Sequence, residues 1–254
     1  MGVVRRVALG LAATTVAGGA LLALEAYVAS RREFLSADSA PPIRGEFGRA
    51  YAPPLRLAVL GDSTAAGVGV SAVEDTVAGR LARTVADTGR FVTLDGLGVS
   101  GSRAGDLAPQ VSRALMHKPD VAVVLIGAND ATHVTDLGEV RDDVRSAVER
   151  LHAAGVRVVV GTCPDMGSAT AFLPPLRQIV AWQGRRVGAA TREAAVIGGA
   201  AVVDIGAETG PEFRRDPGRY LSSDEFHPSA DGYALWADAL APEVRAAAVA
   251  QSVG

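Results

Sequence analysis

Short apolar runs of strand length alternate along the chain with longer stretches whose pattern is typical of helices. The apolar runs lie at Leu55 to Leu60, Phe91 to Leu94, Val121 to Ile126, Val156 to Val160 and Ala201 to Ile205. The helix-like stretches lie at about Val73 to Thr88, Leu107 to His117, Leu137 to Ala154, Leu176 to Gly198 and Ser229 to Ala250. Five such alternations predict a parallel sheet with helices on both faces, joined by right-handed crossovers.

The expected fold class is therefore α/β, a three-layer α/β/α sandwich with a five-stranded parallel sheet of the flavodoxin-like type. No internal repeat of fixed period is present in the sequence. In open sheets of this kind, ligands bind in the crevice at the carboxyl ends of the strands, where the loops leave the sheet. The residues directly after each strand are therefore the first candidates for chemistry.

Residues 1–35 are predicted to be a signal or membrane anchor. Two arginines precede an uncharged stretch from Val7 to Leu24, which is longer than the apolar core of most signal peptides. No clean Ala-x-Ala cleavage site follows, so the interpretation favours an anchor over a secreted, cleaved form. Ser36 to Pro54 is rich in proline, glycine and alanine and predicts a linker, which leaves 55–250 as the main folded domain. The expected location is extracytoplasmic, with the N-terminal segment in contact with a membrane.

Composition narrows the class of function. The 254 residues are 48% hydrophobic and 21% charged, with a net charge of -3, and they show no basic stripe for nucleic acid. Cys163 is the single cysteine and follows an apolar run, so we expect a small buried residue and no disulfide. The sequence lacks a phosphate-binding loop, a dinucleotide fingerprint and a cluster of His and carboxylate ligands. No cofactor and no metal are expected.

A candidate nucleophile stands at the end of the first strand, which reads Gly61-Asp62-Ser63-Thr64. A serine hydroxyl is a weak nucleophile unless a base takes its proton. Asp224 and His227 stand three residues apart in a short irregular segment, where a single turn can bring the carboxylate to the imidazole. The other histidines lie in or beside helical stretches without a comparable carboxylate, and we expect them on the surface: His117, His133 and His152.

Two further strand ends could supply hydrogen-bond donors. Gly96 to Ser102 is rich in glycine, so its backbone amides can approach a ligand closely, although a plain tight turn explains the same pattern. Gly127 to Asp130 contains Asn129, whose side-chain amide could donate to a developing oxyanion or could equally serve a turn or a helix cap.

Taken together, these blocks resemble the SGNH hydrolases, also called the GDSL esterase/lipase family, over about residues 55–245. The resemblance implies that Ser63 is the nucleophile, His227 the general base and acid, and Asp224 the carboxylate that orients it. It also implies an oxyanion hole made by the backbone amides of Ser63 and Gly98 and the side chain of Asn129. The chain departs from the family pattern at Thr64, where leucine is usual, and at Gly96, where many relatives have an asparagine that ties down the loop.

The predicted function is hydrolysis of carboxylic esters through an acyl-enzyme on Ser63. The family includes lipases, carbohydrate deacetylases, thioesterases and phospholipases, so the partner is expected to be an ester-bearing small molecule, a lipid or an acylated glycan. The alternative is a catalytically silent, membrane-tethered module that binds envelope polysaccharide or lipid. Two loops could line an acyl pocket or be ordinary surface: Asp165 to Pro175 and Gly210 to Tyr220.

Overall fold

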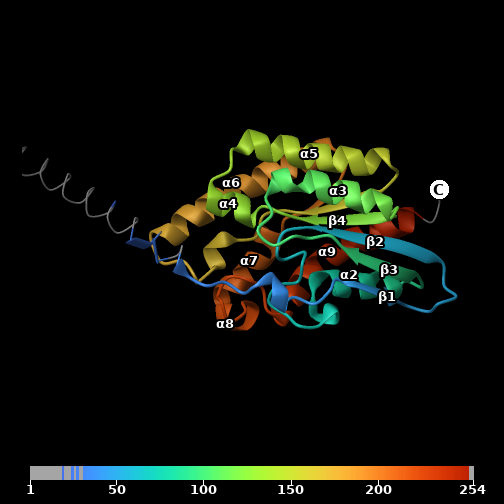
Figure 1. Ribbon diagram of the computed structural model, residues 1–254, viewed down its shortest axis with the longest axis horizontal. Helices are drawn as coiled ribbons and strands as arrows, with labels where there is room; N and C mark the ends of the chain where they lie inside the picture. Colours follow the sequence, from blue (N-terminus) through green and yellow to red (C-terminus); the bar gives the residue numbers. More distant parts are fainter. Residues whose placement is uncertain (1–18, 20–23, 26, 29–30, 252–254) are drawn as a thin grey trace, which may run out of the picture.

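A six-stranded sheet forms the centre of the protein, for which a computed structural model describes residues 19, 24, 25, 27, 28 and 31–251 (Figure 1). The strands follow the order β1-β3-β2-β4-β5-β6, and β2 to β6 run parallel to one another. Their bounds are Arg44–Phe47 (β1), Pro54–Gly61 (β2), Phe91–Gly96 (β3), Val121–Leu125 (β4), Arg157–Gly161 (β5) and Ala201–Val203 (β6). The predicted parallel sheet of five strands is thus present, with β1 added at one edge.

Strand β1 corrects the prediction that Ser36 to Pro54 is only a linker. Arg44–Phe47 pairs antiparallel with β3 and forms the edge of the sheet. The flanking side chains Ile43 and Phe47 are buried, which gives this short segment an apolar contact that its proline-rich surroundings concealed. Gly96 makes the contact possible, because a Cβ added there would lie 2.2 Å from the Cβ of Ile43. The glycine that departs from the family pattern therefore accommodates the edge strand.

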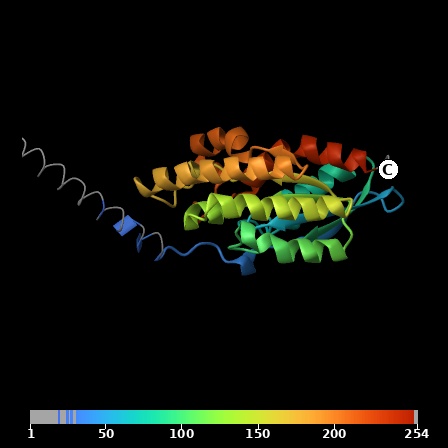
Figure 2. The ribbon, with the colours of Figure 1, turned by 90° about the horizontal axis from the view of Figure 1, so that it is seen from above.

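Helices cover both faces of the sheet, as the alternation predicts (Figures 1 and 2). One face carries α3 (Leu107–Met116), α5 (Leu137–Ala153) and α6 (Leu176–Ile197), and the other carries α2 (Val77–Ala86), α7 (Ile205–Arg215) and α9 (Ala230–Ala250). Successive strand residues point to opposite faces, so Leu57 and Val59 enter one core while Ala58 and Leu60 enter the other. This two-sided burial explains why β2 is an uninterrupted apolar run.

Three short helices were not predicted: α4 (Ala128–His133), α7 and α8 (Pro217–Tyr220). Helices α4 and α8 are short, and α7 contains Pro211, so none has a clear helical repeat of apolar residues. Ile205, which the apolar pattern assigned to the last strand, is instead the first residue of α7, because the Asp204 side chain caps that helix by accepting from the Ala207 amide.

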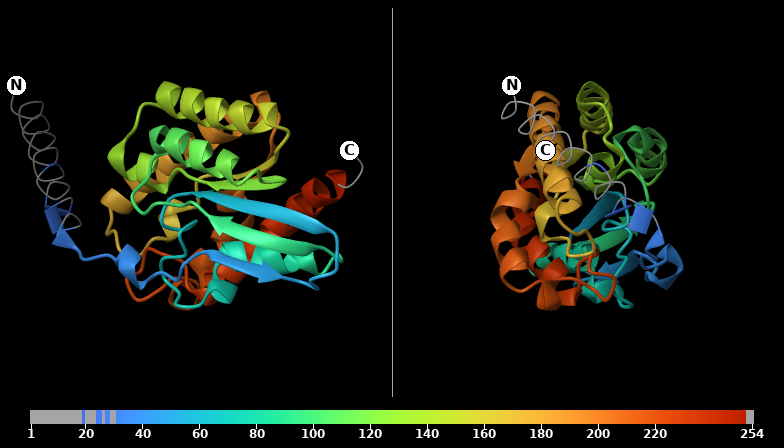
Figure 3. Two further views of the ribbon diagram at one scale, coloured as in Figure 1. Left: turned by 45° about the vertical axis from the view of Figure 1, so that its right-hand side comes forward. Right: turned by 90° about the vertical axis from the view of Figure 1, so that its left-hand side faces the viewer.

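The chain before the sheet packs on the domain. Residues 32–36, called the arm below, have no regular secondary structure and lead through a 3-10 helix at Ala37–Ser39 into β1 (Figure 3). Within the described residues, no helix is both long and apolar enough to cross a membrane. The stretch from Val7 to Leu24 falls outside the described residues except for Gly19 and Leu24, so the predicted anchor or signal stays a prediction.

Candidate active site

The site begins where β2 ends. Gly61 has a φ of 139° and an added Cβ would lie 1.8 Å from the carbonyl oxygen of Leu125, so only glycine allows the chain to turn there. Ser63 follows in the turn, and its side chain is nearly buried, with 6% of the residue exposed. The nucleophile predicted from the sequence is therefore held at the carboxyl edge of the sheet.

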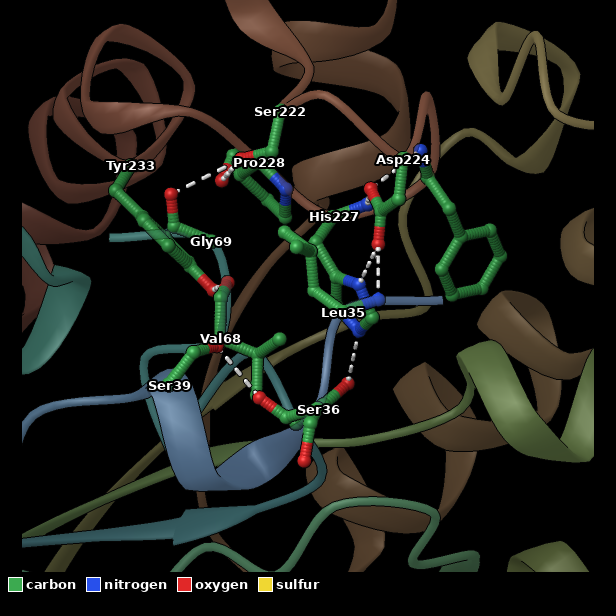
Figure 4. A network of polar contacts seen from close by, with 12 residues as sticks. Leu35, Ser36, Ser39, Val68, Gly69, Ser222, Asp224, His227, Pro228 and Tyr233 are labelled. Atoms are coloured by element: carbon green, nitrogen blue, oxygen red, sulfur yellow. Dashed lines mark hydrogen bonds and ion pairs between the residues drawn. The ribbon is translucent and has the colours of Figure 1, made fainter. Parts of the chain in front are cut away.

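The C-terminal loop brings the other two predicted residues to Ser63. Nε2 of His227 lies 2.9 Å from Oγ of Ser63. Nδ1 of the same ring lies 2.6 Å from Oδ2 of Asp224 (Figure 4). Because a carboxylate accepts at Nδ1, that nitrogen carries the proton and Nε2 is free to accept from the serine hydroxyl. Serine, imidazole and carboxylate form one hydrogen-bonded chain across 164 residues of sequence separation.

Asp224 receives four hydrogen bonds. Oδ1 accepts from the backbone amides of Phe226 and His227, and Oδ2 accepts from the His227 ring and from the backbone amide of Leu35 in the arm, at 3.1 Å. Burial by itself would raise the pKa of this carboxyl, but the hydrogen bonds from the His227 ring and from the Leu35 and His227 amides outweigh it. The pKa of Asp224 is held well below its ordinary value, and the group is ionised at neutral pH.

Three groups close to the Ser63 turn have a hydrogen-bond donor to spare. Within the described part of the chain, the backbone amides of Ser63 and Gly98 have no hydrogen-bond partner. Asn129, in the first turn of α4, uses one side-chain hydrogen to bind the carbonyl of Ser102 at 3.0 Å and keeps the second. It lines the same cleft as Ser63. Free donors beside a nucleophile are what an oxyanion hole requires.

The glycine-rich loop after β3 is fixed without the asparagine that Gly96 replaces. The amide of Leu97 donates to Val59 and that of Val99 donates to Gly61, so main-chain bonds from β2 hold the segment that carries Gly98. An added Cβ at Gly98 would lie 2.7 Å from Ala65, which shows how closely this loop approaches the turn after Ser63.

Gln110 is a buried residue of α3 that sequence reasoning missed. Its side chain accepts from the Gly61 amide at 2.8 Å and donates to the Gly61 carbonyl at 3.0 Å. It also lies 3.2 Å from Oγ of Ser102, and so joins the nucleophile turn to the glycine-rich loop. The only signal in the sequence was one polar residue on the apolar face of a predicted helix.

With this geometry established, comparison with known proteins defines the family. The model of the GDSL-like lipase/acylhydrolase family matches residues 59–235, more than half of the chain and the part that contains Ser63, Asp224 and His227. The chain belongs to this family. As a member of the GDSL-like family, it is 35% identical over 218 residues to the GDSL-like esterase Rv1075c of Mycobacterium tuberculosis; the alignment covers 81% of this chain and 69% of that protein. The family comprises ester hydrolases, the class of activity predicted from the sequence.

Solved structures share the GDSL-like fold. TesA superposes with a TM-score of 0.59 at 19% identity, over 76% of this chain and 99% of that one. A lipase/acylhydrolase from Enterococcus faecalis gives a TM-score of 0.58 at 23% identity, over 76% of this chain and 96% of its own. Axe2, an acetylxylan esterase from Geobacillus stearothermophilus, gives 0.56 at 20% identity, over 77% and 96% of the two chains.

The departure at the fourth position of the GDSL-like signature has a structural role. Oδ1 of Asp62 accepts from the Thr64 amide at 2.9 Å and from the Thr64 hydroxyl at 2.7 Å. Asp62 is buried, which raises its pKa to about 6 even though the Thr64 hydrogen bonds and the charge of His227 act in the opposite direction. Threonine thus supplies a second hydrogen bond that the usual leucine cannot give to a carboxyl group held out of water.

Two cavities flank the His227 ring. A cleft of about 490 Å³ opens beside Ser63 and Asn129, and mostly apolar side chains line it: Phe34, Leu35, Phe172, Leu176, Val180 and Phe226. A much smaller cavity, of about 30 Å³, lies against Ser63 between the loops predicted as candidate pocket walls, with Met166 from one and Phe213 from the other. Of the other predicted wall residues, Phe172 lines the cleft, Leu173 is exposed, and Arg214 forms an ion pair with Asp165.

The remaining candidate groups lie outside the hydrogen-bonded chain. His117, His133 and His152 are exposed, as predicted, although His133 also borders the cleft, with its ring 2.9 Å from the carbonyl of Asn129. Cys163 is buried after β5, and this burial raises the pKa of its thiol well above the ordinary value. Among the described residues, no group of three or more His, Cys, Asp or Glu side chains has the arrangement of a metal site.

Proposed function

We propose that the protein hydrolyses carboxylic esters by forming an acyl-enzyme on Ser63. The observation that carries the proposal is the continuous hydrogen-bonded chain from Oγ of Ser63 through His227 to Asp224. His227 takes the serine proton as the hydroxyl attacks the ester carbonyl, and Asp224 stabilises the imidazolium that forms. The same ring then donates its proton to the leaving alcohol, and water repeats the sequence to release the acid.

The negative oxygen of the tetrahedral intermediate is assigned to the amides of Ser63 and Gly98 and the side chain of Asn129. The two free amides and the second hydrogen of Asn129 support this role, because donors already in place cost no reorganisation during the reaction. The small residues around them keep the donors close to the nucleophile.

The proposed substrate is an ester with an apolar portion, held in the cleft beside Ser63. The apolar lining and the volume of about 490 Å³ favour a lipid-like or aryl ester over a strongly polar one. A carbohydrate O-deacetylase is the second candidate, and the cavity of about 30 Å³ against Ser63 favours it because only a small acyl group would fit there. Hydrolysis rates over a series of acyl chain lengths and acetylated sugars distinguish the two.

The test of the chemistry is labelling by a fluorophosphonate probe together with ester hydrolysis. We expect the wild-type protein to be labelled at Ser63 and Ser63→Ala to be unlabelled, with a loss of turnover of roughly 10⁴-fold or more. Absence of labelling and of hydrolysis in the wild type would favour the silent binding module. Full hydrolysis by Ser63→Ala would contradict the assignment of the nucleophile.

For the location, the proposal is an extracytoplasmic protein attached to a membrane by its N-terminal segment. The two arginines followed by the uncharged stretch Val7 to Leu24 support it. Cell fractionation should recover the full-length chain with membranes. A shortened chain in the medium would contradict the anchor and favour a cleaved signal.

A further inference from the structure

The arm reaches the site from outside the family domain, since residues 32–36 precede the matched range of 59–235. It contacts the loop that carries Asp224 and His227 at three positions. The guanidinium of Arg32 forms an ion pair with Glu225 and lies 3.4 Å from the carbonyl of Ala171. The Phe34 ring packs on Phe226 with centroids 4.9 Å apart, and the Leu35 amide donates to Asp224.

A fourth contact lies further toward the N-terminus. Oε2 of Glu25 accepts from the Leu176 amide at 3.0 Å, at the start of α6, where the N-cap residue Pro175 supplies no side-chain cap. Glu25 is 9% exposed, which is unusual for a carboxylate and is explained by this bond to a helix N-terminus. The contacts at Glu25, Arg32, Phe34 and Leu35 follow the rim of the cleft and use both side chains and main chain.

We infer that the arm is part of the active site: the Leu35 amide positions Asp224, and Phe34 forms a wall of the cleft that holds the apolar part of the substrate. This inference rests on the proposed ester hydrolysis. Leu35 and Phe34 act at different steps, so each gives a separate measurable effect.

Leu35 is a positioning residue. Oδ2 of Asp224 bonds both the His227 ring and the Leu35 amide (Figure 4), so the amide fixes the direction in which that oxygen faces the imidazole. A second donor on the outer side of a carboxylate–histidine pair orients the pair without touching substrate. Loss of this donor should therefore lower kcat more than it changes KM.

Phe34 is a specificity-determining residue. Its ring contacts Phe226, which in turn meets Phe172 edge-on with centroids 5.8 Å apart, so the three rings form one side of the cleft. Phe34 is 36% exposed, and it lines the cleft together with Leu35 of the arm and residues of the domain. Removing the ring widens the cleft where a longer acyl or alkyl chain would lie.

The first experiment compares Leu35→Pro with Leu35→Ala in the full-length protein. Proline removes the N–H, whereas alanine retains it, and residue 34 already lies in a segment without regular structure that tolerates a following proline. We expect Leu35→Pro to lower kcat by about tenfold to a hundredfold with a smaller change in KM. Leu35→Ala should retain most of the wild-type kcat. Wild-type kcat in Leu35→Pro would overturn the positioning role.

The second experiment measures Phe34→Ala on acetyl and hexanoyl esters of the same alcohol. We expect the ratio of the two KM values to change by about fivefold, because the lost ring contacts only the longer chain. Tyr51→Ala is the matched control: Tyr51 is 83% exposed, lies far from the cleft and should leave both KM values as in the wild type. An unchanged ratio of the two KM values in Phe34→Ala would contradict the role of Phe34 as a wall of the cleft.

Failure of this inference can be told apart from failure of the proposed function. If Ser63→Ala abolishes hydrolysis while Leu35→Pro and Phe34→Ala behave as the wild type, the chemistry stands and the role of the arm is wrong. If Ser63→Ala remains active, the nucleophile itself is wrong, and the arm variants have no bearing on that result.

Discussion

The two halves of the site are held in place by different means. Ser63, Gly98 and Asn129 follow strands β2, β3 and β4, and main-chain bonds together with the Gln110 side chain fix them to the sheet. Asp224 and His227 lie in a loop between α8 and α9, closed by a β-bridge between Leu221 and Pro228 and by main-chain bonds such as that from the Ser222 amide to the His227 carbonyl. The nucleophile half therefore depends on the fold as a whole, whereas the proton-transfer half depends on a few local contacts and on the arm.

A small number of hydrogen bonds joins the halves (Figure 4). The Tyr233 hydroxyl, buried in α9, donates to the carbonyl of Val68 at 2.6 Å, and the Ser222 hydroxyl lies 3.1 Å from the carbonyl of Gly69. Both acceptors belong to the loop that follows Ser63. Helix α9 thereby sets the distance between the imidazole and the serine, so variants within either half should affect catalysis in different ways.

Among variants that leave Ser63 in place, the largest expected effect comes from the proton-transfer half. Asp224→Asn keeps the size of the side chain but removes the charge that fixes the proton on Nδ1 of His227. We expect kcat to fall by about 10³- to 10⁴-fold, or about 4 to 5 kcal/mol in activation free energy. Steady-state kinetics measures it, with fluorophosphonate labelling to show that Ser63 is still present and accessible. A loss below tenfold would mean that the carboxylate has no role in orienting the ring.

A smaller effect is expected in the nucleophile half. Asn129→Ala removes one oxyanion donor and should lower kcat by about 10²- to 10³-fold, or about 3 to 4 kcal/mol. Asn129→Asp is the matched variant, because it keeps the shape but replaces the donor with a carboxylate that repels the oxyanion, and it should be at least as slow. Faster turnover by the aspartate variant than by the alanine variant would contradict the assigned donor.

The pH dependence of stability distinguishes the two buried carboxyl groups. The pKa of Asp62 is raised from 3.8 to about 6. Its contribution to the free energy of unfolding is therefore most favourable below about pH 4 and is lost as the pH rises through 6. Asp224, whose pKa is lowered, contributes stability above about pH 4 that is lost as the pH falls toward its folded pKa. A shift of about two units for Asp62 corresponds to roughly 3 kcal/mol.

Asp62→Asn isolates this contribution, since the amide oxygen can still accept from Thr64. The charge of His227 lowers the pKa of Asp62 and the charge of Asp130 raises it. Both neighbours are present in the variant and in the wild type. Urea unfolding from pH 3 to 8 should show the free energy of unfolding of the variant rising relative to that of the wild type as the pH rises, by up to about 3 kcal/mol. Parallel pH profiles for the two proteins would mean that Asp62 is not buried as a titrating acid.

The smallest expected effect is at Gln110. Gln110→Met keeps the volume but removes the bonds to Gly61 and Ser102, and we expect a loss of about 2 kcal/mol in the free energy of unfolding. Turnover should fall as well, because the turn before Ser63 loses its side-chain support. Ser102→Ala removes only one partner of Gln110. Its free energy of unfolding should lie between those of Gln110→Met and the wild type. Full stability in Gln110→Met would show that main-chain bonds alone hold the turn.

The contrast between the halves also describes what the sequence could predict. Buried strands are apolar on both faces and leave a clear pattern, so β2 to β6 were predicted at the right places, although the last predicted run continued to Ile205 and the strand ends at Val203. Asp224 and His227 could be paired because they stand three residues apart. Gln110 was missed because a polar residue on an apolar helix face does not show what it binds, and its main partners are backbone groups of Gly61 that the local sequence does not reveal.

The edge strand and the arm were missed for a related reason. Arg44–Phe47 has four residues in a proline- and glycine-rich segment, and its burial depends on a gap created by Gly96, fifty residues away. The contact between Leu35 and Asp224 uses a main-chain amide, which every residue but proline has. Contacts of this kind follow from the completed fold and cannot be assigned from local patterns.

The covalent connection between arm and domain has a consequence of its own. Ser36 to Ile43 links the Leu35 amide to β1 and contains one short 3-10 helix. A protease that cut this connection would leave Ser63 and His227 on one fragment and their outermost support on the other. Separation of the arm from the domain and slowing of its turnover would then be a single irreversible event.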